Sequence, residues 1–453
     1  MSDPDRFSPD DFESFRVLDR SFDQRSRTAS LHYALDRGPS FVETITFETA
    51  TGASTPVDTA ALERALLHLH IAAGTSYYKT AAPALVSVES DALSPAEVAF
   101  HRHLYDEGLR EFAVGNGLPV PRPVTIAPRS SASQRPPRAG AGGPRRLVVP
   151  IGGGKDSMVL IEALRPLNPR LLAVNPHRLV TDLAERAGLD LLVVRRELSP
   201  NLSALNRAGA RNGHVPITAI ISLIAALGST VYGYDTIAMA IERSASEETV
   251  LVEGVPVNHQ YSKSVEFERL LAGLVATSID PGLTYASALR PYSELAIARA
   301  FASLTRYHSI FCSCNRVFRQ SAGADEGWCG ECAKCRFVGL MLAPFMSPEA
   351  LSAVIGRDMF ADRLQVAGFA ALMSDDDKPF ECVGERRESA AALRMLSDRP
   401  EWKESPVVAA LAARARAMVS DADIEMLLTP TPDLAFPDPE VAAAVDRFVA
   451  VPP

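Results

Sequence analysis

The sequence predicts an α/β protein, with a central doubly wound domain on a parallel sheet, an N-terminal α+β domain and a C-terminal, mainly helical region. Three observations predict this fold class. Residues 145–343 alternate apolar strands with helices, which is typical of parallel sheets covered on both faces. Earlier segments alternate polar and apolar residues, as antiparallel strands do. Residues 344–453 consist mainly of helical segments rich in Ala, Leu and Arg.

The composition narrows the class of protein. A chain of 453 residues exceeds one ordinary core, so we expect several domains. The net charge is −9 and is spread along the chain, which disfavours tight nucleic-acid binding. The acidic N-terminus lacks the apolar core of a signal peptide. The sequence contains no apolar run long enough to predict a membrane span. We therefore expect a cytoplasmic protein; its oligomeric state is left open.

Residues 1–127 are the expected N-terminal domain. Residues 128–144, rich in Ser, Pro, Gly and Arg, predict a flexible linker. Ser94 and Glu97 form a capping box that predicts a helix to about Ala113. The strands of an antiparallel meander are expected at Phe15–Ser21, Thr28–Ala34 and Phe41–Glu48.

The central domain is expected to alternate strands and helices in a fixed order. The predicted elements are strand Leu147–Ile151, helix Lys155–Leu164, strand Leu171–Asn175, helix Leu179–Ala187, strand Leu191–Val194, helix Pro216–Leu227 and a strand near Thr236–Ile241.

A glycine loop follows the first strand of the central domain and reads Gly152, Gly153, Gly154, Lys155, Asp156 and Ser157. Glycines let the backbone approach an anion, and N–H groups at the start of the next helix can bind phosphate oxygens. We expect Lys155 to supply positive charge, Asp156 to bind Mg²⁺ and Ser157 to donate to a phosphate. The spacing differs from that of GxxxxGK[ST] and GxGxxG loops. The simpler alternative is a glycine-rich turn before a helix.

This loop resembles the SGGxDS PP-loop of the ATP pyrophosphatase superfamily, with Gly152 in place of the usual serine. The resemblance implies an adenine nucleotide alpha hydrolase-like domain that binds ATP and cleaves it between the α and β phosphates. Two further residues are predicted to complete the nucleotide pocket. Asn175 ends the second strand, where open α/β sheets place ligands, and His214 precedes the predicted helix Pro216–Leu227.

Five of the six cysteines lie between residues 312 and 335. The spacing of four of them allows four thiolates to bind one tetrahedral Zn²⁺, and these are Cys314, Cys329, Cys332 and Cys335. Unmetallated buried thiols, a redox or persulfide-carrying pair and an iron–sulfur cluster remain alternatives. Cys312 is expected to be structural and Cys382 to be a core thiol.

Several longer polar strings match one PP-loop family. They are 74–79 (GTSYYK), 242–245 (ERSA), 257–264 (VNHQYSKS), 289–294 (LRPYSE), 314–316 (CNR), 328–335 (WCGECAKC) and 378–384 (KPFECVG). Together they resemble the UDP-N-acetyl-α-D-muramoyl-L-alanyl-L-glutamate epimerases of bacterial peptidoglycan synthesis, over about residues 10 to 440.

The resemblance implies that ATP adenylates the terminal carboxylate of L-glutamate, that the α-proton is then exchanged, and that AMP and pyrophosphate are released. His259 is the first choice for the proton carrier because it titrates nearest neutrality, and Lys263 and Tyr261 of the same motif are the other predicted catalytic residues. That motif could instead only bind substrate. The residues expected to bind the substrate are Arg243, Arg290, Glu242 and Lys79.

Other interpretations remain open. Glu242 could be the ion-pair partner of Arg243, and Lys79 and Tyr77 could be structural. Two rival functions are an amidating, nitrile-forming or thiolating PP-loop enzyme, similar to 7-cyano-7-deazaguanine synthase, and a nucleotide-binding regulatory protein without turnover.

Overall fold

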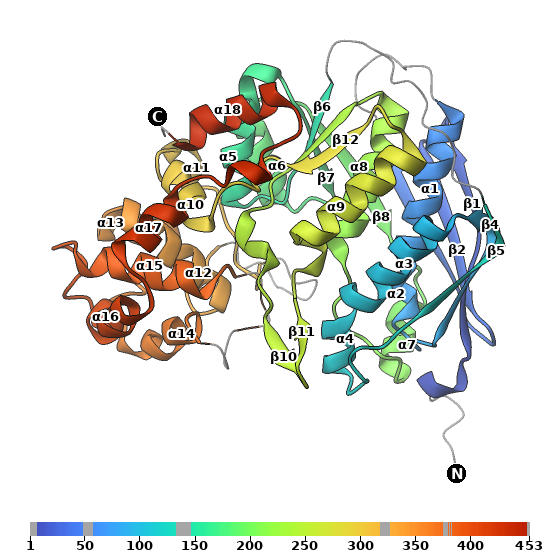
Figure 1. The fold of residues 1–453 in the computed structure, drawn as a ribbon, viewed down its shortest axis with the longest axis horizontal. Helices are drawn as coiled ribbons and strands as arrows, with labels where there is room; N and C mark the ends of the chain where they lie inside the picture. Colours follow the sequence, from blue (N-terminus) through green and yellow to red (C-terminus); the bar gives the residue numbers. More distant parts are fainter. Residues whose placement is uncertain are drawn as a thin grey trace.

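The computed structural model describes residues 7–48, 58–132, 146–317, 327–374, 379, 381 and 383–450. Within these residues, one ten-stranded sheet has the order β12-β9-β6-β7-β8-β3-β2-β1-β4-β5. The C-terminal helices gather at the β12 end of the molecule, and the N-terminal strands form the opposite end (Figure 1). Among the described residues, no helix is both long and apolar enough to cross a membrane.

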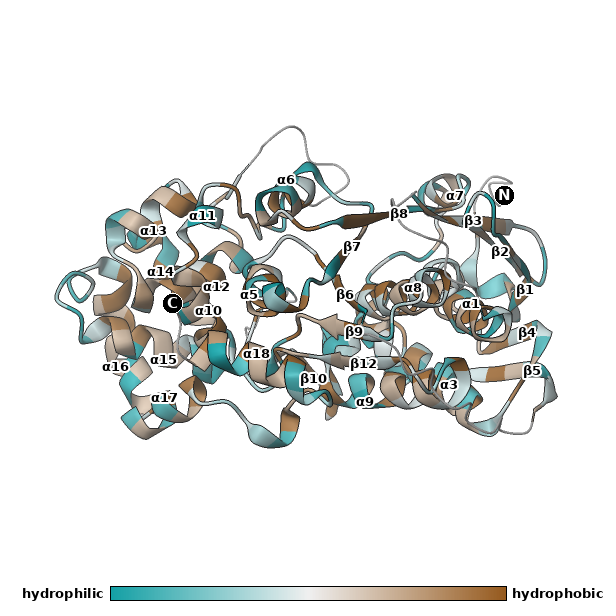
Figure 2. Ribbon diagram, turned by 90° about the horizontal axis from the view of Figure 1, so that it is seen from above, coloured by the Kyte–Doolittle hydropathy of each residue, from teal (hydrophilic) through white to brown (hydrophobic). Residues whose placement is uncertain are grey.

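Five neighbouring strands form a parallel half-sheet, as the sequence predicts: β6 (Leu147–Pro150), β7 (Arg170–Val174), β8 (Leu191–Glu197), β9 (Thr236–Met239) and β12 (Thr284–Ser287). Successive side chains of β6 point to opposite faces of the sheet and pack into two different hydrophobic cores. Leu147 and Val149 pack with α5 (Lys155–Leu164) and α6 (Arg178–Ala187), whereas Val148 packs with α8 (Ile217–Tyr232). Figure 2 shows α5 and α8 on opposite sides of β6. Because both faces are covered, these strands are mainly apolar, apart from the polar end of β8 at residues 195–197.

The predicted meander is also confirmed, as β1 (Ser14–Asp23), β2 (Thr28–Leu35) and β3 (Ser40–Phe47) pair antiparallel. It does not form a separate sheet, because β3 pairs antiparallel with β8, from Thr44 with Glu197 to Phe47 with Val194. The pairing satisfies the backbone at the edge of the parallel strands. One continuous sheet therefore crosses the domain boundary that the sequence predicts.

The structure also differs at the predicted linker, residues 128–144. Strand β5 (Thr125–Ser131) runs through its first four positions and pairs parallel with β4 (Leu85–Leu93), which pairs parallel with β1. Backbone pairing with β4 holds this polar segment as a strand despite its loop-like composition. The rest of the predicted linker, residues 133–144, lies outside the described residues.

The predicted capping box is confirmed, because Ser94 Oγ accepts from Glu97 N–H and Ser94 N–H donates to Glu97 Oε2. The helix expected to reach Ala113 is divided at Leu109. Its two parts are α3 (Pro95–Gly108) and α4 (Arg110–Gly115). The other helices in this region of the fold are α1 (Thr59–Ala73), α2 (Thr75–Tyr78), α7 (Leu202–Ala208) and α9 (Val265–Leu274), and α9 continues into the π-helical turn η5 (Val275–Ile279). Strands β10 (Val250–Val252) and β11 (Val255–Val257) form a hairpin.

The described C-terminal part is helical. Its elements are α10 (Glu294–Ala302), α11 (Thr305–His308), α12 (Ala333–Leu342), α13 (Pro348–Ile355), α14 (Val366–Ala371), α15 (Arg386–Ser397), α16 (Pro406–Met418), α17 (Asp421–Leu428) and α18 (Pro439–Ala450). These helices share the core that covers α5 and α6. The C-terminal helices thus pack directly against the helix that follows the glycine loop.

Candidate active site

The glycine loop lies at the carboxyl end of β6 and leads into α5, as predicted. Gly153 has a φ of +84°, and a Cβ there would lie 3.0 Å from the side chain of Val180. Glycine is therefore required at this turn. A Cβ at Gly152 would meet nothing within 4 Å, and Gly152 N–H donates to Ser157 Oγ at 3.4 Å. The loop thus leaves open space beside Gly152.

Lys155 is buried and forms ion pairs with the carboxylates of Asp156 and Glu294. Burial opposes its charge, but the two carboxylates raise the pKa of Lys155 above its usual value. Its ammonium therefore supplies positive charge beside two carboxylates at the start of α5.

Three carboxylates converge beside this lysine. One oxygen each from Asp156, Glu242 and Glu294 lies within 4.8 Å of the others. Asp156 follows β6, Glu242 follows β9 and Glu294 begins α10 after β12, so the carboxyl ends of three parallel strands bring them together. Burial raises the pKa of Glu294 to about 7, against the effect of Lys155. Oxygen ligands in such an arrangement suit Mg²⁺.

Sequence analysis missed Glu294 and Glu388. Glu388 of α15 accepts from Glu294 N–H at 2.7 Å, and burial raises its pKa to about 8. Glu294 ends the polar string 289–294 directly after the N-cap Ser293, so its motif was a usable signal. No local pattern connects Glu388 to the loop, because the two glutamates lie 94 positions apart.

Asn175 directly follows β7 and is exposed, but its side-chain amide is already hydrogen-bonded. Its Nδ2–H donates to Arg196 O at 2.7 Å, and its Oδ1 accepts from Arg196 N–H at 2.8 Å. The φ of Asn175 is +45°, which asparagine tolerates better than most residues. Its amide thus joins the ends of β7 and β8.

His214 belongs to a second cluster, with Glu111 of α4 and His259, and one ligand atom of each lies within 4.8 Å of the others. His259 Nδ1 lies 2.5 Å from Glu111 Oε2, and His214 Nδ1 lies 3.7 Å from the same oxygen. The two imidazole centroids are 4.7 Å apart. Sequence analysis missed Glu111, because 148 positions separate it from His259.

Two predicted lysines lie close to this cluster. Lys79 Nζ donates to Asn212 Oδ1 at 2.6 Å and to Gly213 O at 3.1 Å, next to His214. Burial, followed by the charge of Arg196, lowers the pKa of Lys79 to about 8. Burial lowers the pKa of His214 to about 4, with smaller contributions from His259, Lys263 and Lys79 in the same direction. His214 is therefore neutral at pH 7.

The predicted substrate arginines have different surroundings. Arg290 is buried and donates to Glu268 Oε2, to Glu242 O at 2.6 Å and to Lys263 O at 2.7 Å. Arg243 donates to Thr431 Oγ1 at 2.6 Å and lines a cavity of about 610 Å³ next to α15 and α17. Within the described part of the chain, Arg243 forms no ion pair with Glu242, whose carboxylate lies beside Asp156.

The two predicted tyrosines lie in the core. The Tyr261 ring packs against Phe267 and His103, and burial raises its pKa far above the usual value. Tyr77 stacks on Phe41 and accepts from Ser199 N–H. The structure brings neither hydroxyl into the cluster of Glu111, His214 and His259.

The four predicted metal-binding cysteines come together as one group, with Sγ atoms within 4.8 Å of one another. Cys335 Sγ lies 3.4 Å from Cys332 Sγ and 3.6 Å from Cys329 Sγ. Tetrahedral Zn²⁺ with bonds of ~2.3 Å needs sulfurs ~3.8 Å apart, so the group could bind zinc after a small expansion. Gly330 provides the turn between Cys329 and Cys332 with a φ of +68°. Cys382 lies outside the described residues.

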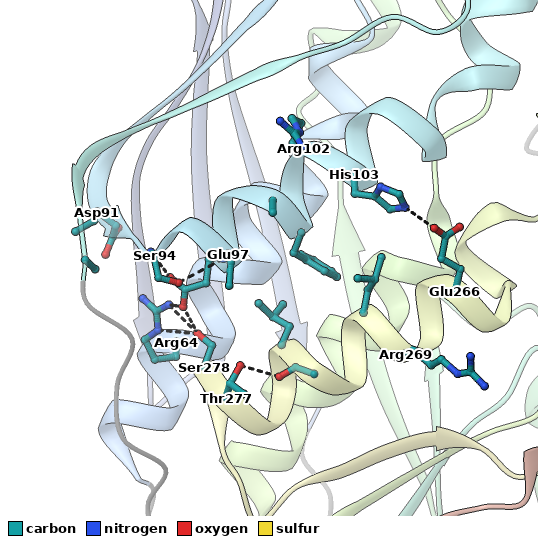
Figure 3. A pocket seen from close by; sticks show the side chains of 18 residues that line it. Arg64, Asp91, Ser94, Glu97, Arg102, His103, Glu266, Arg269, Thr277 and Ser278 are labelled. Atoms are coloured by element: carbon teal, nitrogen blue, oxygen red, sulfur yellow. Dashed lines mark hydrogen bonds and ion pairs between the residues drawn. The ribbon is translucent and has the colours of Figure 1, made fainter. Parts of the chain in front are cut away.

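A cavity of about 790 Å³ lies between α1, α3, α9 and η5 (Figure 3). Two ion pairs lie among its charged side chains, Arg64 with Glu97 and His103 with Glu266. None of the catalytic, nucleotide-binding, substrate-binding or metal-binding residues that the sequence predicts lines this cavity.

Family models of one protein family match the N-terminal and the C-terminal part of the chain. A family model described as the MurL N-terminal domain matches residues 6–288, and one described as the MurL C-terminal domain matches residues 310–425. The chain is 40% identical over 406 residues to the UDP-N-acetyl-alpha-D-muramoyl-L-alanyl-L-glutamate epimerase of Xanthomonas oryzae pv. oryzae, covering 89% of this chain and 90% of that protein. It is 42% identical over 408 residues to the protein of that name in Salinispora tropica, covering 88% of each. No solved structure gives a significant match.

Proposed function

The chain belongs to the MurL family, and on that premise we propose that it is an ATP-dependent epimerase of UDP-N-acetyl-α-D-muramoyl-L-alanyl-L-glutamate. It inverts the terminal L-glutamate through an acyl-adenylate and releases AMP and pyrophosphate. Besides membership of the family, one observation carries the proposal. A glycine loop and three carboxylates converge at the carboxyl ends of the parallel strands, where open α/β sheets bind their ligands.

ATP binds on residues 152–157 through backbone N–H groups and Ser157 in this proposal. Asp156, Glu242 and Glu294 would hold Mg²⁺, whose hard oxygen preference fits three carboxylates. Bound Mg²⁺ would neutralise the charge that develops on the leaving pyrophosphate. Lys155 balances part of the negative charge of this group in the absence of ligands.

Adenylation explains why an epimerase needs ATP. Loss of the α-proton from a free carboxylate would create a dianion, whereas an acyl-adenylate lets the charge spread into an enolate. His259 carries the proton in this proposal, from a partly buried position where water is limited. Lys79 and Lys263 lie close enough to His214 to influence its charge, and they bind anionic groups of the substrate. Water then releases AMP from the inverted product.

Arg243 binds the substrate from the cavity beside α15 and α17, which Arg387 also lines. Two guanidinium groups suit a diphosphate or carboxylate. Arg290 instead positions the active site, because it joins the backbones of the segments that carry Glu242 and Lys263.

The four cysteines bind a structural zinc that connects the chain before α12 to the helix itself. We further propose that the protein acts in the cytoplasm on a small-molecule substrate, without nucleic-acid or membrane partners.

Incubation with ATP, Mg²⁺ and the UDP-muramoyl dipeptide in D₂O tests the function. Chiral analysis should find D-glutamate with one deuterium at Cα, together with AMP and pyrophosphate. An α,β-non-hydrolysable ATP analogue should support no exchange. Inversion without deuterium, or exchange without ATP, would refute the adenylation mechanism. AMP release that depends on ammonia or a sulfur donor would favour the amidating or thiolating alternative. A complete lack of AMP release under all of these conditions would favour the nucleotide-binding regulatory protein.

A further inference from the structure

Helix α4 carries the carboxylate that contacts His259. Glu111 is the second residue of this short helix and lies 2.5 Å from His259 Nδ1 through Oε2. Their side chains are 21% and 14% exposed, so the contact is largely shielded from water but not sealed from a ligand. A carboxylate only accepts hydrogen bonds, so Nδ1 is the donor. In the neutral ring, the basic lone pair is therefore on Nε2.

We propose that Glu111 is a positioning residue that fixes the tautomer of His259 and raises its basicity, so that Nε2 exchanges the α-proton of glutamate. This inference rests on the proposed function for its substrate. It adds a residue from the N-terminal region, outside every sequence motif considered above. In the reaction, the Cα–H bond breaks, the proton goes to Nε2 and the electron pair goes to the activated carbonyl as an enolate.

Hydrogen bonds at both ends of α4 support this role. Arg110 donates to Pro256 O at 2.8 Å, in the strand that leads into the His259 motif. Asn116 Nδ2–H donates to Asn212 O at 3.0 Å, in the loop that carries His214. The helix is thus hydrogen-bonded to the strand before His259 and to the loop of His214, and Glu111 lies between the two bonding residues.

The charges around the pair favour a hydrogen-bonded dyad over a metal centre. Lys79 and Lys263 lie close enough to His214 to lower its pKa, and their positive charges would oppose a divalent cation. His214 is neutral at pH 7, so His259 does not have to share Glu111 with a second cation. The 2.5 Å separation of His259 Nδ1 and Glu111 Oε2 is also a direct contact that leaves no room for a metal ion between the two atoms.

Near-isosteric substitution of Glu111 tests the proposal. In Glu111→Gln, the amide can no longer stabilise an imidazolium. Solvent exchange at Cα should fall by about 100-fold or more, whereas pyrophosphate–ATP exchange, which reports adenylation, should stay within a few-fold of the wild-type rate. Glu111→Asp should recover part of the exchange. The lower limb of the pH–rate profile should move to lower pH by about one unit, because a lost negative charge lowers the pKa of His259.

The matched control is Glu266→Gln. Glu266 also pairs with a histidine, His103 at 3.2 Å, but lines the cavity of Figure 3. This variant should leave exchange and its pH profile unchanged. In a double-mutant cycle, Glu111→Gln in a His259→Gln background should cause little further loss, because both changes disable one unit.

A measurement without substrate separates the dyad from the proposed function. In ¹⁵N NMR, His259 should show Nδ1–H in the wild type, and its pKa should fall by about one unit in Glu111→Gln. That result with a wild type that does not epimerise would keep the contact and refute the reaction. An unchanged His259 tautomer and pKa would overturn the proposal. So would equal losses of adenylation and exchange, or a second bound metal that both His214→Gln and His259→Gln remove.

Discussion

Replacing Arg290 separates a structural role from the substrate-binding role that the sequence favours. Its side chain is 2% exposed and that of its partner Glu268 is 15% exposed. Arg290→Ala leaves the Glu268 carboxylate without its cation and removes the donors to Glu242 O and Lys263 O. Loss of one partner from a buried pair lowers the free energy of unfolding by about 3–5 kcal/mol. We expect a change of that size.

Urea unfolding followed by circular dichroism measures this effect, and steady-state kinetics measure its functional consequence. The double variant Arg290→Met with Glu268→Gln should lose less stability than the sum of its single changes, because no buried charge stays unpaired. Arg37→Ala is the control, since Arg37 and its partner Glu13 are 70% and 80% exposed and such pairs contribute at most about 1 kcal/mol. If Arg290→Ala unfolds like the wild type and only raises KM, Arg290 binds substrate and the structural reasoning is wrong.

Three further predictions concern the loop, the cysteines and acid stability. Asp156→Asn should abolish AMP release while the melting temperature stays close to that of the wild type; normal AMP release would exclude Asp156 as a Mg²⁺ ligand. Elemental analysis should find about one zinc per chain, and Cys332→Ser should lower both zinc content and the free energy of unfolding by several kcal/mol, whereas Cys312→Ser should keep the zinc. Burial lowers the pKa of His70 from 6.5 to about 3, so the unfolded chain binds a proton that the folded chain excludes. The free energy of unfolding should therefore fall with decreasing pH between about 6.5 and 3, by up to ~1.4 kcal/mol per pH unit from this residue, and a slope unchanged in His70→Gln would contradict this assignment.

The sequence alone predicted local structure well where periodicity was strong. Helix Lys155–Leu164 was predicted with the bounds that the structure has, and the strands of the meander were located within two residues. Apolar periodicity, a capping box and glycine placement are properties of neighbouring residues, so one sequence suffices to identify them. The hairpin of β10 and β11 was missed. Its turn residues Glu253 and Gly254 both have positive φ, and the glycine between two apolar segments was a usable turn signal in the sequence.

The cysteine spacing likewise determined which four thiols meet, because two of the three intervals are only three residues long. The sequence also identified the motif around His259 as part of the site. It did not predict which side chains of that motif lie in the cluster with Glu111 and His214. In that motif the His259 side chain approaches Glu111, whereas the Tyr261 ring enters the core. Alternation along an irregular segment follows no fixed period, so orientation could not be inferred from spacing.

Only the tertiary structure determined the long-range arrangement. The pairing of β3 with β8 merges the two predicted domains into one sheet, and it joins segments about 150 positions apart. Glu111 and His259, which are in contact, are also 148 positions apart in the sequence. The strand order places Glu242 and Glu294 beside Asp156. Strand order and register depend on which edges and faces find complementary partners across the whole chain, and no local pattern encodes that choice.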